Sequence, residues 1–112
     1  MAYTNNVLKT TGVVALTSGV ATVYTVPVST FFTVAMLHLA NTSGSAATVR
    51  IYLVPNAGSP SAANGIVWDL SIDANDVLEM MKGDIWTAGD TIQALCSPTG
   101  AVTLKLGGIE TS

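Results

Sequence analysis

Side chains that could perform acid–base or nucleophilic chemistry are few and widely spaced in this chain. It has one histidine, His38, and one cysteine, Cys96, among 112 residues. His38 lies in an apolar segment between Leu37 and Leu39, and no G-x-S-x-G motif supplies a nucleophilic serine. We therefore expect no catalytic residues and no enzymatic activity, with His38 in a structural or interface role and Cys96 as a buried thiol.

Carboxylates are the next candidates, because pairs of them can act as general acids and bases or bind metal ions. Most of them lie in turn-like segments, where a carboxylate usually accepts a hydrogen bond from local backbone; these are Asp69, Asp73, Asp76, Asp84 and Asp90. The segment "DANDVLE" lacks the glycine and glutamate spacing of a calcium-binding EF-hand loop. One cysteine and one histidine are too few ligands for zinc. The sequence predicts no metal site and no cofactor.

Trp86 is the remaining candidate for binding chemistry. It lies close in sequence to Asp84 and Asp90, and an exposed aromatic ring beside carboxylates would suit a shallow sugar site. We interpret Trp86 as an exposed anchor residue and Trp68 as internal. A carbohydrate-binding module is therefore kept as an alternative function.

Composition narrows the class of partner. Charged residues make up 10% of the chain, against roughly 25% in an average soluble domain. The net charge of −3 and four scattered basic residues argue against nucleic acid. No apolar run approaches the ~20 residues of a membrane helix, and the N-terminus lacks a signal-peptide pattern. A small domain with 49% hydrophobic residues and little charge is typical of a component of an assembly.

The elements that would position these residues are strands, because apolar residues alternate and turn residues separate the runs. The pattern predicts an all-β, single-domain β-sandwich of about eight strands, either jelly-roll or Ig-like. Residues 1–20 form an N-terminal arm and first strand, and residues 21–112 form the body. We expect the segment "MAYTNNVLKTTG" to be ordered only against a partner. The predicted strands are Gly12–Leu16, Thr22–Val26, Thr30–Ala40, Ala47–Val54, Ile66–Ile72, Asp76–Met81, Thr91–Ser97 and Ala101–Leu106, with short additions at Ile85–Thr87 and Ile109–Thr111.

Strand phase divides the side chains into a core set and an opposite set. The predicted core comprises Val49, Ile51, Leu53, Ile66, Trp68, Leu70, Ile72, Leu78, Met80, Ile92, Ala94, Cys96, Val102, Leu104 and Leu106. The opposite set is large and uncharged, so part of it should contact neighbouring chains. The interface candidates are Phe31, Met36, His38, Tyr52, Met81 and Trp86.

Six turn-and-strand motifs follow one another along the chain. They are "YTVP", "NTS", "TVRIYLVP", "IDAN", "AGDTIQA" and "GIE", at Tyr24–Pro27, Asn41–Ser43, Thr48–Pro55, Ile72–Asn75, Ala88–Ala94 and Gly108–Glu110. Together they resemble the motifs of small all-β virion proteins of tailed bacteriophages. The resemblance covers about Ala21 to Glu110. The chain departs from the pattern at Met80 and Met81, and it has "VPVST" where "VPAGT" is commoner.

The resemblance implies a structural role in a phage particle, with a capsid cement or decoration protein as the first interpretation. Such a protein is made in the bacterial host cytoplasm and sits on the capsid surface. There it bridges capsomers, often as a homotrimer, and contacts the major capsid protein or another virion protein. A tail, baseplate or head-fibre-base component is the alternative that this resemblance leaves open.

Overall fold

The computed structural model describes residues 5–80 and 83–112. Within these residues the chain forms nine strands and one short 3-10 helix, η1 (Ala62–Asn64). The strands are β1 (Asn6–Ala15), β2 (Ala21–Thr25), β3 (Phe31–Asn41), β4 (Ala47–Val54), β5 (Gly65–Ile72), β6 (Val77–Met80), β7 (Ile85–Trp86), β8 (Thr91–Ser97) and β9 (Val102–Thr111).

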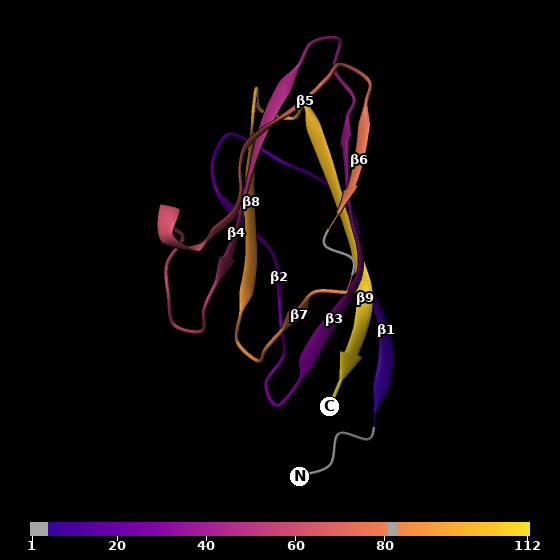
Figure 1. Ribbon diagram of the computed structural model, residues 1–112, viewed down its shortest axis with the longest axis vertical. Coiled ribbons are helices and arrows are strands. Elements are labelled where there is room, and N and C mark those ends of the chain that lie inside the picture. The colour runs from indigo at the N-terminus through magenta and orange to yellow at the C-terminus, as the bar shows by residue number, and fades with distance from the viewer. Residues whose placement is uncertain (1–4, 81–82) are drawn as a thin grey trace.

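The strands make two antiparallel sheets that pack face to face (Figure 1). The first, here called the β1 sheet, has the order β1-β9-β3-β6, with β7 also paired to β3. The second, the β2 sheet, has the order β2-β8-β4-β5. The neighbouring pairs β1/β9, β2/β8, β3/β6 and β4/β5 are those of one long antiparallel ribbon rolled into two sheets. This topology is a jelly roll, so the predicted β-sandwich is confirmed and the Ig-like option is wrong.

Alternation along each strand builds the core between the sheets. In β3, Phe32, Val34, Leu37 and Leu39 are buried, and a bulge at Ala35 shifts the phase between Val34 and Leu37. The neighbouring strand β9 contributes the buried side chains Val102, Leu104 and Leu106, and β4 and β8 of the facing sheet contribute Val49, Ile51, Ile92, Ala94 and Cys96. Most of the predicted core is therefore confirmed.

An aromatic cluster closes the core near the chain ends. The rings of Tyr24 and Phe32 lie 4.8 Å apart between centroids, and Phe32 stacks on Trp86 at 5.6 Å. The Tyr24 hydroxyl donates a hydrogen bond to the Glu110 carboxylate, which joins β2 to β9 across the sandwich. Burial raises the pKa of Tyr24, and the hydrogen bond to Glu110 raises it further.

The two tryptophans are reversed from the sequence prediction. Trp86 is 1% exposed, whereas Trp68 is 46% exposed. The register of β4 against β5 shifts between Val49 and Ile51, which leaves two β5 residues opposite Arg50. This bulge breaks the alternation, so Trp68 faces solvent. Ile66, also predicted to be core, is 41% exposed.

The N-terminal prediction also needs correction. Residues 6–12 belong to β1 and pair with β9 of the same chain, from Asn6 opposite Thr111 onward. Residues 6–12 are therefore part of a strand in the chain's own sheet, held by backbone hydrogen bonds to β9, and residues 1–4 lie outside the described residues. The strand could not be recognised by alternation of apolar and polar residues, because its residues are mostly polar and a bulge at Gly12 shifts the phase. The short extension at Ile109–Thr111 is part of β9, and Met81 lies outside the described residues.

Candidate interaction surface

The outer face of the β1 sheet turns away from the core, and its side chains form rows across the strands. Opposite residues in an antiparallel pair point to the same face, so the registers define each row. A charged row contains Val13, Lys105, His38 and Glu79. A central row contains Thr10, Gly107 and Met36, and an apolar row contains Leu8, Ile109, Thr33 and Ile85. The large apolar side chains stand in solvent: Leu8 is 85% exposed and Val13 72%.

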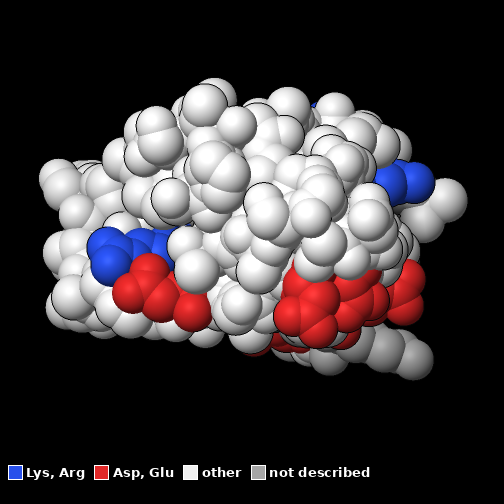
Figure 2. Space-filling model, turned by 90° about the horizontal axis from the view of Figure 1, so that it is seen from above, with Lys and Arg blue, Asp and Glu red and all other residues white. Residues whose placement is uncertain are grey.

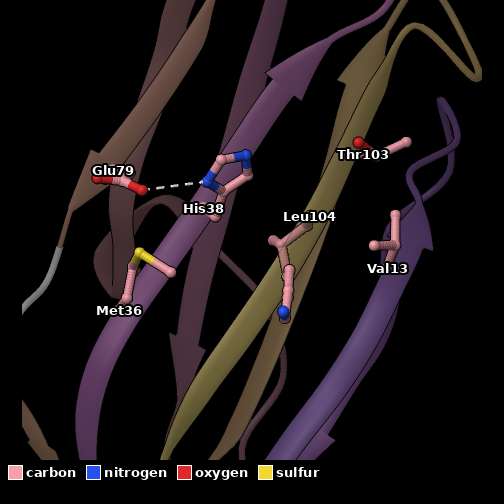
Figure 3. Close-up of a pocket in the computed structure, with 7 residues that line it drawn as sticks. Val13, Met36, His38, Glu79, Thr103 and Leu104 are labelled. Atoms are coloured by element: carbon pink, nitrogen blue, oxygen red, sulfur yellow. Dashed lines mark hydrogen bonds and ion pairs between the residues drawn. The ribbon is translucent and has the colours of Figure 1, made fainter.

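The charged row can be followed in Figure 3. His38 on β3 points toward Glu79 on β6, and its Nδ1 lies 3.4 Å from the Glu79 carboxylate. Val13 on β1 and Thr103 on β9 lie on the same side of the sheet. Lys105 lies opposite His38 in the register and makes no ion pair with any residue in the described ranges.

A groove of about 400 Å³ crosses the strands between the charged row and the apolar row. Its lining residues are Leu8, Lys9, Thr10, Ala35, Met36, Lys105, Gly107, Gly108 and Ile109. The groove exists because the central row is made of small residues beside one methionine. Two further hollows border the same methionine, on the side of His38 and Glu79. The face is therefore hollowed along its middle.

Two adjacent glycines in β9 have different reasons to lack a side chain. A Cβ at Gly108 would lie 2.6 Å from Phe32 Cζ and would also meet the Thr33 carbonyl oxygen, so the packing requires glycine there. A Cβ at Gly107 would meet nothing closer than the Lys9 carbonyl oxygen at 3.9 Å. The backbone of Gly107 is not in the left-handed region either. No steric clash therefore requires a glycine at position 107, which lies next to the bulges of β3 and β1.

The outer face of the β2 sheet has a different character, because its side chains pair with one another. The Arg50 guanidinium donates to both Asp69 carboxylate oxygens, at 2.6 and 3.1 Å, and lies 4.0 Å from the centroid of the Trp68 ring. Tyr52 meets Trp68 edge-on at 5.8 Å and is itself buried. The bulge in β5 makes this possible by placing Trp68 and Asp69 together opposite Arg50.

Electrostatics agree with this pairing. The hydrogen bonds from Arg50 hold the pKa of Asp69 below its ordinary value, and those bonds, with one to Tyr52, raise the pKa of Arg50. Both members of the pair are charged at neutral pH. The side chains of this cluster therefore bind and stack on one another. Residues of the same chain cover the outer side of β4 at Arg50 and Tyr52.

The predicted interface residues separate into three groups. Phe31, Met36 and His38 lie half-buried on the outer side of β3, together on the β1 sheet. Tyr52 lies on the other sheet and is buried, and Trp86 is inside the core, so neither is a free contact residue. The same face also carries Leu8, Lys105, Gly107 and Ile109, which the sequence prediction did not include. The alternation of inward-facing and outward-facing residues in "LKLGGIE" can be read from the sequence. The position of β9 between β1 and β3 cannot be read from it.

Three of the five aspartates that the turn prediction named accept a hydrogen bond from local backbone, whereas Asp69 lies in β5 and accepts from the Arg50 side chain. Asp76 accepts a hydrogen bond from the Val77 N–H, Asp84 from the Ile85 N–H, and Asp90 from the Thr87 N–H. Asp84 also accepts one from the Trp86 indole N–H at 2.9 Å, so the proposed sugar cluster is a structural one. Over residues 5–80 and 83–112, no group of three His, Cys, Asp or Glu side chains could hold a metal ion. In the same ranges no helix is long and apolar enough to cross a membrane.

Charged residues are few in this chain, at 10% of the sequence. The end of the molecule seen in Figure 2 is mostly uncharged, and its acidic side chains gather along one side.

Comparisons with known proteins add little. No protein-family model matches the chain, and no curated protein matches it. Among solved structures, a chain from the crystal structure of the T13 IBDV viral particle is similar over 98% of this chain, with a TM-score of 0.48 and 8% sequence identity. The alignment covers 31% of that chain's length. A similarity this low carries no argument about function.

Proposed function

We propose that the chain is a structural protein of a bacteriophage virion, and specifically a capsid cement or decoration protein that acts through the outer face of its β1 sheet. That face carries the proposal. It is four strands wide, mostly uncharged and hollowed along its middle, and it exposes large apolar side chains such as Leu8 and Val13. Such a surface is typical of a protein that is covered in its working state.

The size of the face suits a stable contact. Its width is four strands about 4.8 Å apart, and its length is about ten residues with a rise of about 3.3 Å each, so its area is roughly 600 Å². This area is close to the ~800 Å² that each partner buries in a standard interface. Burying half of it contributes roughly 7 kcal/mol at ~25 cal/mol per Å², before the entropic cost of association. Repeated over a capsid, such a contact adds cohesion that the particle loses when it swells.

The fold is compatible with this role but does not select it. Jelly rolls occur in viral capsid domains, lectins and cupins, and function is carried by sites and surfaces. The virion role is supported by the sequence motifs that resemble small phage proteins. We propose a non-enzymatic homo-oligomer, a trimer, on the capsid surface, made in the host cytoplasm and adjoining the major capsid protein.

A tail, baseplate or head-fibre-base component would use the same face and is the second candidate. The carbohydrate-binding alternative loses its basis, because Trp86 is buried and its indole N–H is bound to Asp84. The exposed ring of Trp68 does not replace it, because Arg50 already lies over that ring.

Immunogold electron microscopy of purified particles tests the proposal. Antibodies raised against the chain would label virions of the phage whose genome encodes it. Label over the capsid is the expected result, and label confined to the tail would replace the first role with the second. Intact virions without label, while the antibody still detects the free protein, would overturn both.

A further inference from the structure

Asn64 and Gly65 form the one Asn-Gly pair of the chain, at the point where η1 ends and β5 begins. We propose that this pair is a deamidation site, which the folded β4–β5 loop holds unreactive and which reacts when the loop opens. Asparagine is one of the thermolabile residues of proteins, and a following glycine leaves its backbone nitrogen open to the side chain because it has no Cβ. The inference does not depend on the proposed virion role.

The reaction needs only the two residues and water. The Gly65 backbone nitrogen gives its proton to solvent and attacks the side-chain carbonyl carbon of Asn64. A bond forms between these two atoms, the bond from the carbon to Nδ2 breaks, and ammonia leaves with a proton taken from solvent. Water then opens the cyclic imide at either of its carbonyl groups and leaves an aspartate or an isoaspartate at position 64. No atom changes its oxidation state.

The fold holds both reacting groups in other hydrogen bonds. Asn64 Nδ2 donates to the Ser59 carbonyl oxygen at 2.8 Å, and Asn64 Oδ1 accepts from the Ser61 backbone N–H at 3.0 Å. The Gly65 N–H donates to the Ala62 carbonyl oxygen. Attack requires the Asn64 amide to turn and the Gly65 nitrogen to lose its proton, so these bonds must break first.

Packing requires the glycine and also fixes its position. A Cβ at Gly65 would lie 2.7 Å from Trp68 Cε3, so a larger residue would press on the ring. That ring is held by the Arg50 guanidinium, 4.0 Å from its centroid. Gly65 also lies opposite Tyr52 in the register of β5 against β4. The labile pair is therefore a consequence of the packing, and the same contacts protect it.

Opening of the loop exposes the pair, and the product cannot restore the loop. Ser59 and Ser61 are exposed and Asn64 is half-buried, so the loop can open without global unfolding. A carboxylate at position 64 has no N–H for the Ser59 carbonyl oxygen. An isoaspartate also lengthens the backbone by one carbon directly before β5, which displaces Gly65. Deamidation is thus expected to leave the loop open.

Incubation of the purified full chain in mildly alkaline buffer, with and without urea, tests the inference. Peptide mass spectrometry follows the loss of each side-chain amide. Asn64 is expected to react at least about tenfold faster in urea than in the folded protein. Asn56, which precedes Ala57, is the internal control and should react more slowly than Asn64 in urea. Equal rates at Asn64 in both conditions, or an Asn64 that is no faster than Asn56 in urea, would overturn the inference.

Two variants test the protecting contacts in the folded protein. Trp68→Ala removes the ring beside Gly65, and Pro60→Gly loosens the loop between the two backbone partners of Asn64. Each is expected to raise the rate at Asn64 several-fold, whereas Ser71→Ala, on the exposed side of β5, should keep the wild-type rate. Thermal unfolding of every variant sets an incubation temperature below all of the transitions. Wild-type rates in both loop variants would refute the protection, and no outcome bears on the immunogold location.

Discussion

The outer faces of the two sheets differ in what their side chains contact. On the β2 sheet, Arg50 pairs with Asp69, stacks on Trp68 and leaves Tyr52 covered. On the β1 sheet, Leu8 and Val13 stand in solvent beside an open groove. On the first face the large side chains contact one another within the chain. On the second face, apolar side chains of the kinds found in the core are exposed to solvent.

This difference teaches that exposure alone does not mark a contact surface. Trp68 is 46% exposed, yet an arginine and a tyrosine already occupy its ring. The β1 sheet is the better candidate because its exposed residues are apolar and adjacent in rows, and because Gly107 keeps space open among them.

The largest expected effect separates a residue inside the sandwich from its neighbour on the face. Trp86→Ala should lower the free energy of unfolding by about 3–5 kcal/mol, because it empties the aromatic cluster. Ile85→Ala, one residue away and exposed, should change it by less than about 0.5 kcal/mol. Urea unfolding measures both, and similar losses would mean that Ile85 is also part of the core.

The two glycines of β9 sharpen the same contrast. Gly108→Ala should cost about 1–3 kcal/mol, because its Cβ would press on Phe32 and the Thr33 backbone. Gly107→Ala should be neutral or stabilise by roughly 0.5 kcal/mol, because alanine restricts the unfolded chain and meets no neighbour. Denaturant unfolding compares the two, and a loss at Gly107 as large as at Gly108 would refute the assignment of its role.

A pH titration tests the buried link between the sheets. The pKa of Tyr24 is raised in the folded state, so its contribution to stability is present below pH ~10 and is lost as the pH rises above that ordinary value. Tyr24→Phe should reduce the alkaline slope of the unfolding free energy against pH. Equal slopes in both proteins above pH ~10 would show that Tyr24 titrates normally.

The smallest effect is expected on the β2 sheet. The lowered pKa of Asp69 means that its pairing with Arg50 stabilises the fold above the ordinary carboxyl pKa and is lost as the pH falls. Asp69→Asn should flatten this acid dependence slightly, since the ion pair lies at the protein surface. It should leave the oligomeric mass unchanged, and a change in that mass would move the contact surface to the β2 sheet.

The sequence allowed much of the fold to be predicted, because alternation is strong wherever one face is buried. It predicted β3, β4 and β8 closely, and it predicted that turn aspartates bind local backbone. It assigned the tryptophans wrongly because a bulge in β5 shifts the phase at Trp68, and because two-residue β7 is too short to show a phase. Phe31, Met36 and His38 lie together on the outer face of β3, and their role in an interface stays a prediction. The groove could not be predicted, since it depends on the pairing of β9 with both β1 and β3.

Charge exchange on the outer face of the β1 sheet tests the central claim most directly. Lys105 and Glu79 are exposed, so Lys105→Glu and Glu79→Lys should leave folding intact. Light scattering should show that each single variant dissociates and that the double variant regains the wild-type oligomer, because complementary charges meet again between copies. Single variants that keep the wild-type mass, or a double variant that stays dissociated, would contradict an assembly built on this face.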